Sequence, residues 1–207
     1  MAYEFAGLNI NWQGGGGFAR DDWAFVRTVI QALDVKTVLE YGCGLSTELM
    51  VAMGLDVLSL ETQEQFADIY GAAGFNVKLC DYDEGYLDLR PLAVPPRELP
   101  RFDIGFVDGP GEQERHDRYK SVEHAALWCS AIYLHDYDLS QFEQLDDSSR
   151  WLPVTRYAER QNHLYIRDWY RLGDNSSIKR LAEALSARRV PFSDEFAELA
   201  AGGAEDE

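Results

Sequence analysis

Short runs of apolar residues recur along the chain, and most of them end at an acidic side chain. The run that contains Val38 and Leu39, for example, has Glu40 at its carboxyl end. Short apolar runs bounded by polar or turn-forming residues are typical of buried strands. The pattern predicts five strands: the run through Val38 and Leu39, and residues 56–61, 75–80, 102–107 and 131–134.

Between these runs, apolar residues recur at helical spacing. Phe25, Val29, Ile30 and Leu33 share one face of a helix that begins at Asp21 or Asp22. Strands that alternate with helices form an open, mostly parallel sheet, whose ligands bind beyond the carboxyl ends of the strands. Further helices are predicted from the turn after Glu40 to about Gly54, over 63–73 and 119–128, from Ser176 or Ser177 onward, and around 194–201.

The second half of the chain adds a different strand pattern. Residues 151–159 and 163–168 alternate between apolar and polar positions and are joined around Gln161 and Asn162, which predicts an antiparallel hairpin. We expect residues 1–207 to form a single domain, because no internal repeat or second core is visible. Residues 1–19 are predicted to form a flexible arm, and residues 202–207 a disordered tail.

Charge is the strongest compositional feature, since the 207 residues carry a formal net charge of −17. Such an acidic surface repels phosphate backbones, which argues against nucleic acid as a substrate unless a local basic groove exists. No apolar run reaches the roughly 18 residues of a membrane span, and the amino terminus lacks the layout of a secretory signal. Three cysteines without a Cys-x-x-Cys pair are typical of reduced core residues in a cytoplasmic protein.

The turn after the first strand is the most informative stretch. Gly42 and Gly44 follow Glu40, and the hydroxyls of Ser46 and Thr47 suit the start of a helix. Glycines let a ligand approach the main chain closely, and a helix amino terminus favours an anionic group. A turn without any ligand is the simpler interpretation. A dinucleotide fingerprint would require a third glycine where this chain has Thr47.

The string Glu40-Tyr41-Gly42-Cys43-Gly44 instead resembles motif I of the class I S-adenosylmethionine-dependent methyltransferases. The resemblance covers roughly residues 20–170. It implies an α/β, Rossmann-like fold with helices on both faces of a seven-stranded, mostly parallel sheet. The hairpin would supply the antiparallel strands, in the order 3-2-1-4-5-7-6.

The resemblance also implies a cofactor site. Glu40 and the glycine turn would face the methionine part of S-adenosylmethionine, and Asp81 with Tyr82 would meet the adenine. Glu61, at the end of the second strand, would accept hydrogen bonds from the ribose; the alternative is that it only caps the helix that follows. The candidate cofactor residues are Glu40, Tyr41, Gly42, Gly44, Ser46, Glu61, Thr62, Asp81, Tyr82 and Asp108.

Two carboxylates at neighbouring strand ends, Asp108 and Asp136, are candidates for the chemistry, with Asp138 close behind them. Converging carboxylates repel one another, and a divalent cation such as Mg²⁺ would relieve the repulsion. These two acids and the tetrad that begins at His116 resemble the metal-dependent, catechol-type O-methyltransferases. That resemblance implies Asp108, Asp136 and Asp138 as metal ligands. The segment 109–115 is longer here, and Tyr137 replaces an amide.

Methyl transfer to a hydroxyl group often needs a base. His116 stands where the O-methyltransferases carry a catalytic lysine, and a neutral imidazole can do the same task near pH 7. His135, directly before Asp136, is the alternative base, and Asp108 is the third catalytic candidate. The sequence thus predicts a cytoplasmic methyltransferase with a small-molecule acceptor. The alternatives are a non-catalytic cofactor-binding protein and an enzyme of other chemistry on the same fold.

Overall fold

A computed structural model of the chain describes residues 20–80, 102–109, 115–135, 151–157, 162–167 and 176–202, together with short strands at 3–5, 8–10, 82–83 and 86–87. Its centre is a seven-stranded sheet in the order β10-β11-β9-β8-β3-β4-β5. The seven strands are β3 (Thr37–Tyr41), β4 (Asp56–Glu61), β5 (Val77–Leu79), β8 (Phe102–Val107), β9 (Cys129–Leu134), β10 (Trp151–Tyr157) and β11 (Asn162–Arg167).

The predicted topology is confirmed. β5, β4, β3, β8 and β9 are parallel, β11 is antiparallel to β9, and β10 is antiparallel to β11. Counted along the chain, the spatial order is 3-2-1-4-5-7-6. β5 is shorter than the predicted strand because the Phe75 N–H donates to the Tyr70 carbonyl and closes the preceding helix.

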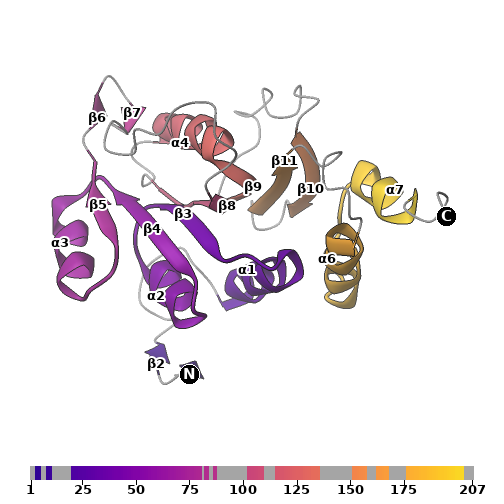
Figure 1. Cartoon of the computed structure of the whole chain (residues 1–207), viewed down its shortest axis with the longest axis horizontal. Coiled ribbons are helices and arrows are strands. Elements are labelled where there is room, and N and C mark those ends of the chain that lie inside the picture. The colour runs from indigo at the N-terminus through magenta and orange to yellow at the C-terminus, as the bar shows by residue number, and fades with distance from the viewer. Residues whose placement is uncertain are drawn as a thin grey trace.

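Helices cover both faces of this sheet, as the resemblance implied (Figure 1). α1, α2, α6 and α7 share a core with one face, and α4 packs on the other. The predicted helix start at residue 119 is late, since α4 begins at Arg115. The helices are α1 (Arg20–Leu33), α2 (Leu45–Ala52), α3 (Glu64–Ala72), α4 (Arg115–Trp128), α6 (Ser176–Ala187) and α7 (Asp194–Gly202).

Alternation along the strands divides the side chains between the two faces. In β3, Val38 joins the core with α1 and α2, whereas Leu39 and Tyr41 join the core with α4. Glu40 therefore points to the α1 and α2 side. On the other side α4 packs so close to β8 that a Cβ added at Gly105 would lie only 2.9 Å from the Ala125 Cβ.

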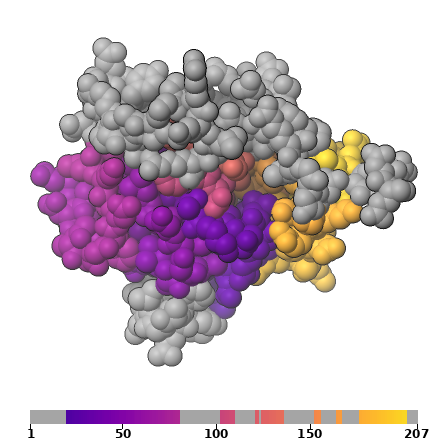
Figure 2. Space-filling view, in the orientation of Figure 1, coloured from indigo at the N-terminus to yellow at the C-terminus, as the bar shows by residue number. Residues whose placement is uncertain are grey.

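The remaining described strands lie outside the main sheet. β1 (Tyr3–Phe5) pairs with β2 (Leu8–Ile10), and β6 (Tyr82–Asp83) pairs with β7 (Tyr86–Leu87), both antiparallel. Most of the predicted arm and of the predicted tail lies outside the described residues. Within the described part, no helix has the length and apolar character to cross a membrane. In the space-filling view α3 and the carboxyl-terminal helices lie at opposite ends (Figure 2).

Candidate active site

The carboxyl ends of β4, β3, β8 and β9 are joined in a row beyond the strands. The Gly42 N–H donates to the Leu60 carbonyl at 2.8 Å, and the Asp108 N–H donates to the Tyr41 carbonyl at 3.2 Å. The His135 N–H donates to the Val107 carbonyl at 3.0 Å. These bonds bring the predicted residues of four strand ends to one edge of the sheet.

Two glycines pack against each other at this edge. Gly42 has φ +89°, and a Cβ there would lie 3.1 Å from the Gly109 Cα. A Cβ at Gly109 would lie 2.9 Å from the Tyr41 carbonyl oxygen. Side chains are therefore excluded from both positions. Gly44 is different: its backbone is extended, and a Cβ there would have no neighbour within 4 Å. Gly44 faces open space.

Glu40 lies under the glycine turn and is fully buried. Ser46 Oγ donates to its Oε1 at 2.6 Å, while Thr47 Oγ1 and Ser59 Oγ donate to its Oε2 at 2.6 and 2.5 Å. Burial raises the pKa of the Glu40 carboxyl to about 7; the three hydroxyls oppose this shift, and the charge of Asp108 adds to it.

The hydroxyls that were predicted to begin a helix thus serve Glu40 as well. Thr47 Oγ1 accepts the Gly44 N–H at 2.9 Å and donates its own proton to Glu40. Sequence reasoning missed Ser59. Its signal was a single hydroxyl in the otherwise apolar interior of β4, directly beside Glu40 in the register.

Glu61 is a nearly buried acceptor of backbone N–H groups. Its Oε1 accepts from Thr62 at 2.7 Å and from Gln63 at 2.9 Å, which is the helix-capping role considered above. Its Oε2 accepts from the Cys43 N–H at 3.0 Å and lies 3.4 Å from the Cys43 thiol. Burial, reinforced by Glu61, raises the pKa of the Cys43 thiol to about 12. Through these hydrogen bonds Glu61 links the backbone of the glycine turn to the start of α3.

Asp108 belongs to a row of three ionisable groups. Its Oδ1 lies 2.8 Å from His135 Nδ1, and His135 Nε2 lies 3.5 Å from Asp22 Oδ2. The side chains of Asp22 and His135 are 5% and 0% exposed, whereas that of Asp108 is 27% exposed. A ligand can therefore contact Asp108 directly, whereas His135 is buried and can affect such a ligand only through Asp108.

Sequence reasoning missed Asp22. It was used only as a helix start, yet Val26 and Val29 follow at spacings of four and seven residues and are buried. An acidic residue on the buried face of a helix indicates a polar partner inside the protein. Here one polar neighbour is His135, which follows β9 and whose Nε2 lies 3.5 Å from Asp22 Oδ2.

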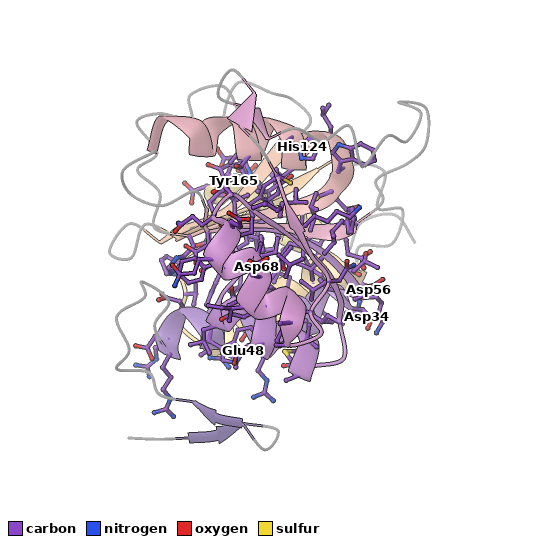
Figure 3. All side chains as sticks on the ribbon, turned by 90° about the vertical axis from the view of Figure 1, so that its left-hand side faces the viewer. Asp34, Glu48, Asp56, Asp68, His124 and Tyr165 are labelled. Atoms are coloured by element: carbon purple, nitrogen blue, oxygen red, sulfur yellow. The ribbon has the colours of Figure 1, made fainter. Side chains whose placement is uncertain are left out.

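Tyr41 points away from Glu40, into the core beneath α4. Its hydroxyl lies 2.6 Å from His124 Nδ1, and its ring meets the imidazole edge-on. Figure 3 shows His124 on α4, across the sheet from Glu48 of α2. Only the Tyr41 backbone adjoins the turn, so a cofactor contact by its side chain is not supported by this orientation.

His124 should make the protein sensitive to acid. Burial lowers the pKa of His124 to about 4. Between about pH 6.5 and 4 the imidazole is therefore protonated in the unfolded chain but stays neutral in the folded protein. Stability is thus lost as the pH falls through this window. Relative to wild type, His124→Asn should gain about 3 kcal/mol of unfolding free energy between pH 7 and pH 4. Urea denaturation at both pH values measures this difference, and equal pH dependence in the two proteins would contradict it.

Several predicted residues lie outside the described part of the chain. Asp81, Asp136 and Asp138 fall in undescribed segments, and of Tyr82 and His116 only the backbone, in β6 and α4, is described. Among the side chains that the structure describes, no group of three or more His, Cys, Asp or Glu residues could hold a metal ion. Of the three predicted metal ligands only Asp108 has a described side chain, so the Mg²⁺ site stays a prediction.

No family model and no curated protein matches the sequence, but solved structures match the fold. A protein from Staphylococcus aureus, named as a caffeoyl-CoA O-methyltransferase, is 13% identical over 72% of this chain and 84% of its own, with a TM-score of 0.50. An rRNA methylase from Streptococcus thermophilus is 13% identical over 72% and 98%, with a TM-score of 0.44. WbdD is 12% identical over 76% of this chain, with a TM-score of 0.46, and the chain spans 42% of its length.

The strand order, the two helical layers and the likeness to the S. aureus structure define the fold. This chain has the fold of the class I S-adenosylmethionine-dependent methyltransferases.

Proposed function

We propose that the protein is an S-adenosylmethionine-dependent methyltransferase that acts on a hydroxyl group of a small molecule. The observation that carries the proposal is the glycine turn between β3 and α2, with buried acids at the ends of β3 and β4, on a methyltransferase fold. In such folds a ligand binds beyond the carboxyl ends of the strands, at the helix amino terminus.

Glu61 and the glycine turn would hold the cofactor. The open space at Gly44 lets a ligand lie against the backbone. A carboxylate has about four acceptor positions, and Glu61 uses them for three backbone N–H groups and the Cys43 thiol. The thiol is the weakest donor of the four, so its contact is the one that a ribose hydroxyl would replace. Asp81 and Tyr82 remain the predicted adenine contacts.

Bound S-adenosylmethionine supplies an electrophilic methyl group. The acceptor oxygen would form a bond to this carbon while the carbon–sulfur bond breaks and its electrons stay on sulfur. Asp108 is the exposed end of its ionisable row, so it is the member of that row that a ligand can contact, and His135 and Asp22 would orient it from behind. The predicted base that would take the hydroxyl proton is His116. Mg²⁺ assistance remains a prediction, and activity after chelation of divalent ions tests it.

A small-molecule acceptor is favoured by the net charge of −17. Phosphate backbones would be repelled by this surface, with a screening length of about 8 Å in 0.15 M salt. Assays should therefore compare hydroxylated small molecules with RNA as acceptors. Methylation of RNA alone would contradict the acceptor class.

Calorimetric titration with S-adenosylhomocysteine tests the proposal. The wild type should bind with a Kd in the range of about 1–100 μM, and Gly44→Ala should weaken binding about tenfold, because its methyl group enters the ligand's space. Gly71→Ala is the matched control: it also adds a methyl group in open space, on α3, and should leave the affinity unchanged. A wild type that does not bind would overturn the cofactor assignment.

A further inference from the structure

Three carboxylates adjoin the glycine turn: Glu61, which already accepts three backbone N–H groups, and Glu40 and Asp108, which differ in their access to a ligand. Glu40 is fully buried, whereas the side chain of Asp108 is 27% exposed. S-adenosylmethionine and S-adenosylhomocysteine both carry an α-ammonium group, which a carboxylate would bind. The inference concerns which of the two receives it, and it rests on the proposed function.

Glu40 is enclosed by its own protein. Hydroxyl groups from the first turn of α2 and from the middle of β4 surround it, all at 2.5–2.6 Å. They use three of its roughly four acceptor positions, and no part of the residue is exposed. A ligand ammonium group would have to displace at least one of these hydroxyl groups to reach Glu40.

The same bonds fix the backbone that a ligand would touch. Thr47 links the Gly44 N–H to Glu40, and Ser46 ties the first turn of α2 to the other carboxylate oxygen. Ser59 holds the carboxylate from the neighbouring strand. Glu40 thus connects β3, β4 and α2 beneath the turn, so it sets where Gly44 lies.

Asp108 has the opposite character. It follows β8 directly, its N–H donates to the Tyr41 carbonyl, and the next residue packs on Gly42. Its carboxylate is therefore beside the turn rather than beneath it. His135 holds Oδ1 at 2.8 Å, which fixes the orientation of a side chain that is still partly exposed.

We propose that Asp108 receives the α-ammonium group of the ligand and that Glu40 is a positioning residue, which acts through the hydroxyls of Ser46, Thr47 and Ser59. Asp108, after β8, then supplies the negative charge that binds the ammonium group. Glu40, at the end of β3, holds the backbone of the turn in place.

The experiment compares two ligands by calorimetry: S-adenosylhomocysteine and its deamino analogue, in which hydrogen replaces the α-amino group. For the wild type, the analogue should bind about tenfold more weakly, the usual scale of one charge-assisted contact. In Asp108→Asn this ratio should fall to about one, because the ammonium contact is lost while Asn still accepts from His135.

Glu40→Gln and Ser59→Ala should behave differently. Both should weaken the two ligands by the same factor, about threefold or more, and keep the wild-type ratio, because they move the turn and not the ammonium contact. Glu64→Gln, an exposed change on α3, is the control for loss of one negative charge.

The outcomes are separable. A ratio that collapses in Glu40→Gln and persists in Asp108→Asn overturns the inference, and so do unchanged affinities in both Glu40→Gln and Ser59→Ala. A wild type that binds neither ligand overturns the proposed function itself. Thermal unfolding of each variant shows that it is folded, and the deamino analogue reports on the rest of the site.

Discussion

Replacing Glu40 with glutamine should remove a large pH dependence from the stability of the protein. The folded pKa of Glu40 is raised from 4.5 to about 7, mainly by burial. The unfolded chain therefore releases this proton near pH 4.5, while the folded protein keeps it to about pH 7. Ionisation thus costs stability as the pH rises through this window. Below pH 4.5 both states are protonated, and the cost disappears.

The magnitude follows from the shift. The stability of Glu40→Gln minus that of the wild type should increase by about 3 kcal/mol between pH 4.5 and pH 8. Urea denaturation at both pH values measures it, and taking the difference cancels any change in packing that glutamine causes. Glu64→Gln, at an exposed position, is the matched control. A difference that is constant with pH would show that Glu40 ionises alike in both states.

Replacing Gly42 with alanine should destabilise the protein by about 3 kcal/mol, from two causes. A φ of +89° costs an L-residue about 1–2 kcal/mol, and the new Cβ would lie 3.1 Å from the Gly109 Cα. The neighbour is backbone, so it cannot rotate away. The two loops must separate, which also moves Asp108.

The chain offers a control for each cause. Gly74 has φ +91° but no neighbour within 4 Å, so Gly74→Ala isolates the backbone cost at about 1 kcal/mol. Gly44→Ala, with an extended backbone and open space, should change stability by less than about 0.5 kcal/mol. Equal losses for Gly42→Ala and Gly74→Ala would mean that the contact with Gly109 has no energetic weight.

The fold was predictable because its signals are local. The apolar runs that end at Glu40, Glu61 and Asp108 identified the strand ends, and the motif I resemblance supplied their order. Strand bounds were less accurate at β5, where the end of α3 uses Phe75. The start of α4 at Arg115 was missed because its first turn has no apolar stripe.

The site was predictable only in part, because much of it depends on side chains that meet across the sheet. Glu40 was placed at the turn, but its enclosure by Ser59 requires the register of β3 and β4. Asp22 is far from His135 in sequence, and no periodicity reveals that they meet. Tyr41 adjoins the turn in sequence, yet strand alternation turns its side chain to the other face.

The register of β3 also has a consequence for the order in which the chain assembles. Val38 pairs with Val57 in β4 and with Ile104 in β8, so one partner is near in sequence and the other is distant. Every member of the Glu40 network lies within residues 40–59, so its loop is short and closes at low entropic cost. Asp108 and His135 join only when β8 and β9 dock. A ligand that touches both the turn and Asp108 would therefore stabilise a contact between segments that are distant in sequence.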